Sequence, residues 1–287
     1  MGTSTSSKGP ESGVPFDPPW LDNAGGNDGT DQDDNENSDE TDSDKNPGDS
    51  SIPGKKPSPN MELAPTGRFK NARTSLGKYA KEGDNAYLRK ALGHYSKTGM
   101  GGASRLANRM QKTTKTAASI VKLLSSPSST SNTEEKQWFT NLYNSDASAR
   151  DVINEIVKRL LPESGGLEEN SCSDSIAKAL SEFIEINDDA DLAHLNESEI
   201  KDIVESFLSY EAYNRLMQDM GQLFERSKIT PTQSVHLRNE IREYLKSELS
   251  RQLDKLWDTT KNPSQAQLNQ IMKLTIENSF KVYEDEL

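Results

Sequence analysis

The sequence has little of the chemistry on which disulfide-linked, zinc-binding and membrane proteins depend. Cys172 is the single cysteine among 287 residues, so an intramolecular disulfide and a cysteine-rich zinc site are excluded. The three histidines, at positions 94, 194 and 236, are scattered and do not suggest a metal centre. Apolar residues make up only 31% of the chain, and no apolar run approaches the roughly eighteen residues that cross a bilayer. No hydrophobic stretch follows the N-terminus, as a secretory signal requires. We therefore expect a cytoplasmic protein without membrane contact.

Charge is distributed unevenly along the chain, whose net charge is −12. Residues 1–60 carry a net charge of −9, residues 61–126 one of +10, and residues 127–287 one of −13. A basic block therefore lies between two acidic ones. The first block has too few apolar residues to offset the ~1–2 kcal/mol of backbone entropy that ordering each residue costs. We predict a disordered acidic tail over residues 1–66.

One apolar, proline-stiffened island interrupts this tail. It runs from Val14 to Leu21 and includes the sequence Pro18-Pro19-Trp20-Leu21. Proline-rich segments with an aromatic residue dock in aromatic grooves of partner proteins. The island is either such a docking motif or a stretch that rests on the chain's own folded part.

From Gly67 onward, apolar residues recur at three- and four-residue steps, which is typical of amphipathic helices. The pattern breaks at Gly83, and Asp84 suits the N-cap of a second helix. The glycines of residues 98–102 predict a flexible corner, and a third helix is expected from about Ala103 to Ser125. Residues 67–125 are thus a predicted basic three-helix segment, followed by a serine-rich linker over residues 126–133.

The remaining residues, 134–287, predict an acidic helical bundle. Capping signatures precede three of its expected helices, at Asn196, Thr230 and Asn262. No strand-like alternation of useful length is present. The predicted fold class is all-α, a helical bundle with a long disordered acidic N-terminal tail.

The basic block predicts contacts with a polyanion. Thirteen lysines and arginines occur in residues 61–126. They are interleaved with Phe69, Tyr79, Tyr87 and Tyr95, a combination that fits phosphate contacts with base stacking. Alternatively, the block pairs with acidic parts of the same chain or with an acidic partner protein. The candidate binding residues are Arg68, Lys70, Arg73, Lys78, Arg89, Lys90, Arg105 and Arg109.

Catalytic signatures are missing from the sequence. It has no Walker A loop, dinucleotide-binding glycine pattern, nucleophile elbow or zinc-ligand spacing. Gly99, Gly101 and Gly102 precede a basic helix, as in a phosphate-binding nest, but a corner between helices is the more ordinary interpretation. Cys172 is expected to be inert and His94 to be a packing residue. We expect a protein that is not an enzyme, with no catalytic, cofactor-binding or metal-binding residues.

The N-terminus offers a different kind of chemistry. The initiator Met1 is removed before a residue as small as Gly2, which exposes an α-amine with a pKa near 7.7–8.0. Part of that amine is unprotonated at neutral pH, and glycine can enter a narrow active site because it has no Cβ. The Met-Gly-x-x-x-Ser spacing also matches the myristoylation pattern. The remaining interpretation is an ordinary start followed by a tail.

Two segments resemble the QatB family of the bacterial Qat anti-phage defence system. The first includes Met1-Gly2-Thr3-Ser4 and Pro18-Pro19-Trp20-Leu21. The second covers residues 67–110, with the runs GRFKNARTSLGKYA, YLRKALGHY and TGMGG. Beyond Asn132, the sequence is similar to the family only as a helical region.

The resemblance implies partners and a use for Gly2. The implied partners are a QueC-like enzyme of deazaguanine chemistry (QatC), a P-loop ATPase (QatA) and a TatD-like nuclease (QatD). Under the hypothesis that follows from the resemblance, this chain is a protein substrate, and QatC conjugates its Gly2 to a 7-deazaguanine base. Thr3, Ser4, Thr5, Pro18, Pro19, Trp20 and Leu21 are then the residues of the tail that dock on the partner. The rival function is a nucleic-acid-binding subunit that recruits the nuclease through the basic segment.

Overall fold

The computed structural model consists of helices and contains no strand in the residues that it describes, which are 64–128, 134–143, 147–162, 166–187, 191–220, 230–257 and 263–287. The chain divides into two units, Met1–Thr66 and Gly67–Leu287. The all-α prediction is confirmed within the described ranges. The predictions for Gly2, Thr3, Ser4, Thr5 and the Pro18-Pro19-Trp20-Leu21 island lie outside the described residues.

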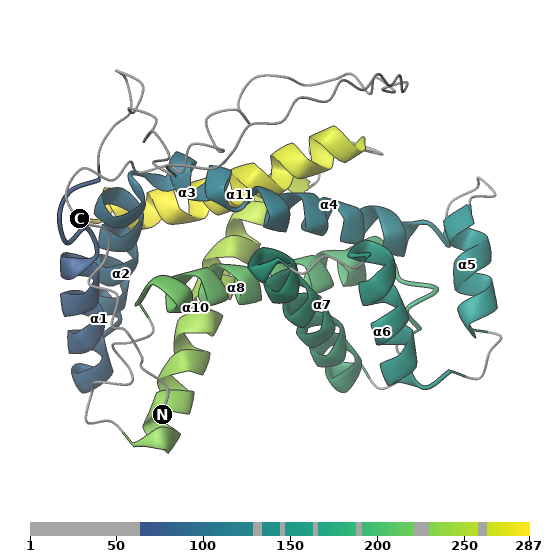
Figure 1. The fold of residues 1–287 in the computed structure, drawn as a ribbon, viewed down its shortest axis with the longest axis horizontal. Coiled ribbons are helices and arrows are strands. Elements are labelled where there is room, and N and C mark those ends of the chain that lie inside the picture. The colour runs from purple at the N-terminus through teal and green to yellow at the C-terminus, as the bar shows by residue number, and fades with distance from the viewer. Residues whose placement is uncertain are drawn as a thin grey trace, which may run out of the picture. The chain divides into compact units, whose positions relative to one another are not determined.

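The second unit consists of helices joined by short connections (Figure 1). None of the helices in the described ranges has the length and apolar composition of a membrane span. The helices are α1 (Lys70–Glu82), α2 (Asn85–His94), the π-helical turn η2 (Tyr95–Met100), α3 (Ala103–Arg109), α4 (Gln111–Ser125), α5 (Glu134–Tyr143), α6 (Ala149–Leu160), α7 (Leu167–Ile186), α8 (Glu197–Met220), α10 (Pro231–Trp257) and α11 (Gln265–Asp285).

Hydrogen bonds confirm two of the predicted N-caps. The Asp84 carboxylate accepts a bond of 2.8 Å from the backbone N–H of Ala86 at the start of α2. Before α8, the Asn196 side chain accepts from the Glu199 N–H at 3.1 Å, while the Glu199 carboxylate accepts from the Asn196 N–H at 2.7 Å. These bonds satisfy amide groups that the first turn of a helix leaves without a partner.

The two C-terminal helices also begin with reciprocal caps. Before α10, the Thr230 hydroxyl accepts from the Gln233 N–H at 3.3 Å, and the Gln233 side chain accepts from the Thr230 N–H at 3.0 Å. For α11 the predicted position was wrong by two residues. The capping pair is Ser264 and Gln267 rather than a pair that starts at Asn262. The Ser264 side chain accepts a hydrogen bond from the N–H of Gln267, the third residue of the helix, so the helix begins at Gln265.

The core of the unit is built on α11 and α8. Helix α11 packs against α2, α3, α4 and α10, and α8 packs against α4, α7 and α10. The segment 67–125 and the helices that follow residue 133 therefore lie within one compact unit. The apolar residues that recur at three- and four-residue steps along α11 are buried: Leu268, Ile271, Met272, Ile276, Phe280 and Tyr283.

The predicted third helix is interrupted at Met110. Its backbone there has φ −95° and ψ 28°, and α3 ends while α4 begins at Gln111. The prediction of one helix from Ala103 to Ser125 was therefore wrong. The sequence around Met110 contains no glycine or proline, and the apolar periodicity continues through it. Neither feature of the sequence therefore indicates that a helix ends there.

The corner predicted before α3 is partly helical. Helix α2 continues as the π-helical turn η2, and the backbone reverses only at Gly101 (φ 80°) and Gly102 (φ 110°). Gly99 has a different role, because a Cβ there would lie 2.5 Å from the Phe69 ring. The turn therefore needs positive φ at two glycines and close aromatic packing at the third.

Helix α2 packs closely against the C-terminal end of the chain at Gly93. A Cβ at this position would collide with the carbonyl oxygen of Tyr283 and lie 2.9 Å from the Leu287 side chain. Because the obstacle includes backbone, no rotamer change can relieve it. Glycine is the residue that allows these two helices to touch.

We predict that Gly93→Ala lowers the midpoint of thermal unfolding because α2 must move away from α11. The cost of overpacking a buried contact is about 1–3 kcal/mol. Circular dichroism of the full chain on heating measures it. Lys90→Ala, at an exposed site in the same helix, is the control and should leave the midpoint nearly unchanged. Equal midpoints for the two variants would contradict this assignment.

Candidate functional site

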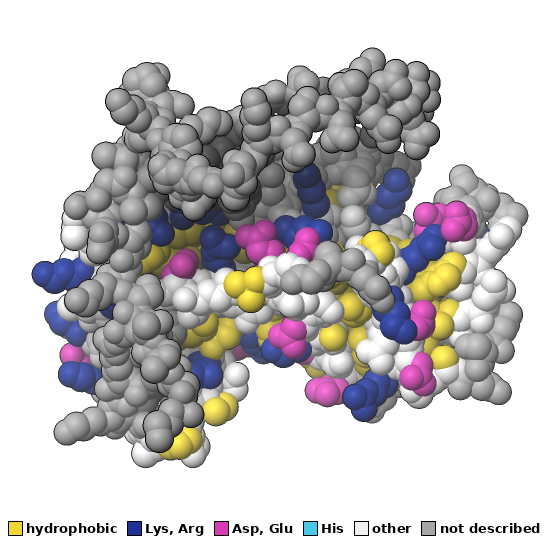
Figure 2. All heavy atoms as spheres, in the orientation of Figure 1, with side chains coloured by type: hydrophobic (Ala, Val, Ile, Leu, Met, Phe, Trp, Pro, Cys, Tyr) yellow, Lys and Arg dark blue, Asp and Glu magenta, His cyan; other side chains and the backbone are white. Residues whose placement is uncertain are grey.

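The structure divides the eight predicted basic binding residues into two groups. Lys70, Lys78, Arg89 and Lys90 are exposed on α1 and α2. On the face drawn in Figure 2, basic side chains gather along the edge that α1 and α2 form, and basic and acidic side chains alternate elsewhere. The other four residues, Arg68, Arg73, Arg105 and Arg109, are half-buried or buried. The predicted basic block therefore does not present a single continuous surface.

The aromatic residues expected to stack on nucleic-acid bases face the core instead. Phe69, Tyr79 and Tyr95 are buried, each with no more than 6% of its surface exposed. Tyr87 is half-buried, with the Lys78 ammonium 5.3 Å from its ring centroid. The stacking prediction was therefore wrong for three of the four rings. Their spacing along α1 and α2 is that of an apolar helix face, which packing explains without a ligand.

Part of the basic block pairs with the acidic helices of the same chain. Arg89 lies 3.6 Å from Glu286, and Lys112 lies 3.2 Å from Glu169. The Ser96 hydroxyl donates a hydrogen bond to Glu284. These contacts agree with the alternative in which the positive segment is neutralised within the protein.

The half-buried arginines converge at the C-terminal end of α8. Tyr95 donates a hydrogen bond of 2.8 Å to the Asp219 carboxylate, and Arg73 donates one of 3.1 Å to the Asp219 backbone oxygen. Arg215 lies 3.9 Å from the same carboxylate. We call the group formed by Arg68, Arg73, Arg109, Arg215, Tyr95 and Asp219 the arginine cluster.

Cation–π contacts and a pair of stacked rings hold the arginine cluster in place. The Arg68 guanidinium lies 4.8 Å from the centroid of the Phe69 ring, and that of Arg73 lies 5.9 Å from it. The Phe69 ring stacks in turn on Tyr95, with the centroids 5.7 Å apart. The Phe69 and Tyr95 rings are part of the core, so they hold the guanidinium groups of Arg68 and Arg73 in a fixed orientation.

Burial dominates the pKa values in the cluster, and neighbouring charges add to its effect. Burial lowers the pKa of Arg68, and the neighbouring Arg109 and Arg215 charges lower it further, while Asp219 opposes them. Burial raises the pKa of Tyr95 well above its usual range, and the charge of Asp219 adds to the effect. Tyr95 therefore remains a neutral hydrogen-bond donor at any physiological pH.

A second buried polar group lies next to the cluster, around Glu211 on α8. Its carboxylate accepts hydrogen bonds from Thr113 at 2.9 Å, from Ser171 at 2.8 Å and from Ser175 at 2.7 Å. The Cys172 thiol lies 3.4 Å from the same carboxylate. These donors hold α4 and α7 against α8, because a buried carboxylate is tolerated only when it is well hydrogen-bonded.

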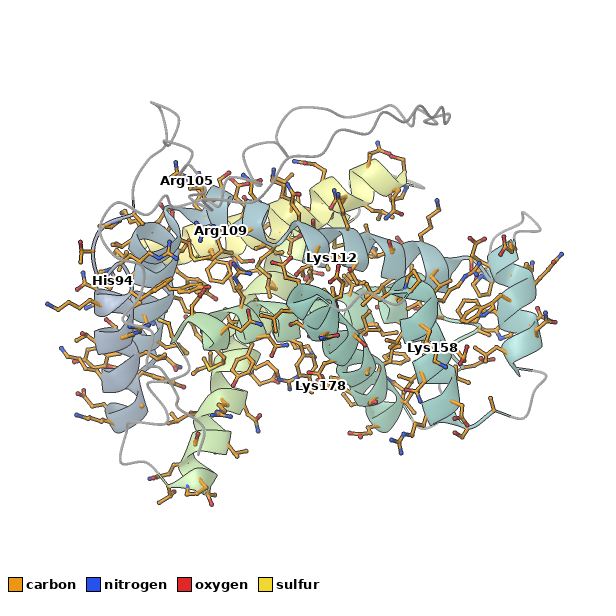
Figure 3. The ribbon with its side chains drawn as sticks, in the orientation of Figure 1. His94, Arg105, Arg109, Lys112, Lys158 and Lys178 are labelled. Atoms are coloured by element: carbon orange, nitrogen blue, oxygen red, sulfur yellow. The ribbon has the colours of Figure 1, made fainter. Side chains whose placement is uncertain are left out.

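A shallow pocket separates the two groups and has a volume of about 20 Å³, enough for one water molecule. Figure 3 shows Arg105, Arg109 and Lys112 following one another along α3 and the start of α4, and Arg109 and Lys112 belong to the pocket. This volume cannot enclose a nucleobase or a nucleotide. The pocket is lined by Arg109, Met110, Lys112, Thr113, Glu168, Ser171, Glu211, Arg215 and Gln218.

The sequence interpretation missed three polar residues of α8, namely Glu211, Arg215 and Asp219. One signal was present for Glu211, which follows the buried Phe207 by four residues and therefore shares its helix face. A charged residue at such a position indicates a buried polar network. Arg215 and Asp219 continue the same four-residue spacing toward the end of the helix.

The fold and these sites define an all-α protein in which a basic helical segment is packed against acidic helices. A family described as "Qat anti-phage system associated protein QatB" matches residues 101–283. Since this match covers more than half of the chain, the chain belongs to the QatB family and has a role in the Qat anti-phage defence system. No curated protein and no solved structure matches the chain.

The family match and the resemblance seen in the sequence overlap only at residues 101–110. The resemblance was drawn from residues 1–22 and 67–110, whereas the match extends from α3 to α11. The matched range includes the Glu211 network, as well as Arg109, Arg215 and Asp219 of the arginine cluster. The match confirms membership of the family. It also includes the helices after Asn132, which resembled the family only as a helical region.

We predict that Cys172 resists alkylation in the folded protein. Burial raises the pKa of this thiol, and the nearby Glu211 carboxylate raises it further, so almost no thiolate forms at pH 8. The measurement is the mass after iodoacetamide treatment, with and without denaturant. Labelling should be complete only in denaturant. Equal labelling rates in the two conditions would show that the thiol is accessible and the network is open.

Proposed function

We propose that this chain is a non-enzymatic adaptor and protein substrate of the Qat system, whose Gly2 is conjugated to a 7-deazaguanine base by the QueC-like partner QatC. The family membership supports the defence role. The conjugation is supported by the sequence, which offers a small N-terminal residue with a free α-amine after removal of Met1.

The proposed reaction forms one amide bond. QatC uses ATP to activate the carboxylate of a carboxy-deazaguanine. The neutral α-amine of Gly2 attacks the activated carbonyl carbon in place of ammonia, the activating group leaves, and the amine loses a proton. Catalysis belongs to the partner, and this chain supplies the nucleophile.

The observation that carries the proposal is the division of the chain at Thr66. Gly2 belongs to the unit Met1–Thr66, and the helices belong to the unit Gly67–Leu287. A protein substrate needs this separation of tasks, because the reacting residue must enter the enzyme while another part binds the complex. In the first unit, Thr3, Ser4, Thr5 and the Pro18-Pro19-Trp20-Leu21 island are the residues proposed to dock on QatC.

We predict an added mass on Gly2 that requires the QatC gene. Intact mass spectrometry of the chain purified from cells with the whole operon should show the adduct, and cells without that gene should yield the plain chain lacking Met1. Fragmentation would locate the added mass. An unmodified Gly2 in cells that carry the intact operon would refute the conjugation.

The matched variants are Gly2→Pro and Ser7→Ala. Proline permits removal of Met1 but leaves a secondary, hindered amine, so the adduct should be lost. Ser7→Ala changes a tail residue outside the proposed docking set and should retain the adduct.

The second candidate is a nucleic-acid-binding subunit that recruits the TatD-like nuclease QatD, with the P-loop ATPase QatA as a further partner. The observation that favours it is the row of exposed basic residues on α1, α2 and η2. These are Lys70, Lys78, Lys81, Arg89, Lys90 and Lys97. With Phe69, Tyr79 and Tyr95 buried, this binding would rest on phosphate contacts and would show little sequence preference.

For this candidate we predict DNA binding that weakens steeply with salt. Each phosphate contact contributes about −0.9 to the slope of log K against log salt for duplex DNA. The triple change of Lys70, Lys78 and Lys90 to glutamine should therefore flatten the slope by about two to three. Fluorescence anisotropy with labelled duplex measures it, and Lys255→Gln on α10 is the control. Binding that is absent, or unchanged in the triple variant, would exclude this role for α1 and α2.

A further inference from the structure

The arginine cluster brings guanidinium groups from separate elements close together. Arg215 lies 3.9 Å from the Asp219 carboxylate and 3.4 Å from Glu168, and its charge acts on Arg68, while Arg73 bonds the Asp219 backbone oxygen. Positive charges brought together on a partly desolvated surface repel one another more strongly than they would in water. An anion placed between Arg68 and Arg215 would reduce this repulsion.

Several donors in the cluster are not used for structure. Arg73 is committed to the backbone oxygen at the end of α8. The Nε atoms of Arg68 and Arg215 are buried, and neither has a hydrogen-bond partner among the described residues. Arg215 therefore approaches Asp219 without bonding it through this atom. The protein side chains that the structure describes therefore leave part of the hydrogen-bonding capacity of these two guanidinium groups unused.

The cluster is preorganised rather than mobile. The Arg68 guanidinium lies 4.8 Å from the centroid of the Phe69 ring, and Tyr95 donates a hydrogen bond to the Asp219 carboxylate. Arg109 is 93% buried and donates toward the Met100 sulfur. Guanidinium groups held in this way lose little entropy when they bind an oxyanion, and their planar forks match the oxygens of a phosphate.

The cluster is also reachable from solvent. Arg68 is half-buried, and the side chains of Arg215 and Asp219 are 26% and 25% exposed. Arg109 and Arg215 also line the pocket, together with Lys112 and with the acidic Glu168 and Glu211. Because the pocket holds only one water molecule, the bound anion must sit at the surface of the cluster, with the rest of its molecule outside.

We propose that the arginine cluster is a phosphate-binding site, in which a phosphate-type oxyanion bridges Arg68 on one side and Arg215 on the other. Asp219 orients the site and limits its affinity for small monovalent anions. Glu168 competes for Arg215 and is displaced when the anion binds. The site involves neither Gly2 nor the exposed lysines of α1 and α2, so it stands or fails separately from both proposed functions.

Two sources could supply this phosphate, and the same chain distinguishes them. One is a free small phosphate compound, for which inorganic pyrophosphate is the probe. The other is the end of a nucleic-acid strand, for which the probe is a short oligonucleotide with a 5′-phosphate, compared with the same strand carrying a 5′-hydroxyl. Backbone phosphates are common to both strands, so only the terminal group differs.

The experiment is a thermal unfolding titration of the full chain, purified without the other Qat proteins, with sodium chloride at matched ionic strength as the reference. A ligand that binds only the folded state raises the midpoint in a saturable way. We expect pyrophosphate to raise it beyond the chloride reference. Arg68→Gln should weaken the apparent affinity about tenfold or more, because it removes charge-assisted hydrogen bonds. Arg150→Gln, an exposed arginine on α6, is the matched control and should retain the effect.

Each outcome decides the proposal. Stabilisation by pyrophosphate that Arg68→Gln abolishes supports a small phosphate ligand. Stabilisation only by the 5′-phosphorylated strand supports a nucleic-acid end. A shift equal to that of chloride, or one retained in Arg68→Gln, overturns the site. If Arg68→Gln does not fold, Arg68→Lys keeps the charge but loses the planar fork, and an undiminished affinity in that variant also overturns it.

Discussion

The contact between α11 and the basic segment is the interaction on which the rest of the described unit depends. A chain with so few apolar residues cannot build one core in residues 67–125 and another after residue 133. Helices α2, α3 and α4 therefore bury their apolar faces against α11. The glycine at position 93 allows the two backbones to meet. Polar contacts such as those of Arg89 with Glu286 and Ser96 with Glu284 then follow from this placement, since they lie at the same seam.

Much of this architecture could be predicted from the sequence, because helix formation and burial are encoded locally. The spacing of apolar residues identified the buried face of α11, and the side chains of Asp84, Asn196 and Thr230 marked helix starts. The break at Met110 and the π-helical turn at Tyr95 left no local trace. They are set by packing against α11 and α8, which the spacing of residues in one helix does not describe.

The candidate sites were harder to predict for a physical reason. Basic residues near one another in the sequence separate in the fold, because lysine is strongly hydrated and stays in water while arginine tolerates partial burial on an aromatic ring. Lys70 and Lys90 are exposed, whereas Arg68 and Arg73 lie over Phe69. Their counterparts on α8 are more than a hundred residues away in the sequence, as the separation of Tyr95 and Asp219 shows. Only the tertiary fold brings these groups together.

The position of Arg68 in the chain gives the arginine cluster a structural role. Gly67 is the first residue of the helical unit, and Arg68 follows it directly. The Arg68 guanidinium lies over the Phe69 ring, which stacks on Tyr95, and Tyr95 donates a hydrogen bond to Asp219 near the end of α8. The start of the helical unit is therefore tied to a helix that is distant in the sequence. Because these contacts join such distant residues, they form only when α2 and α8 have both reached their places in the fold.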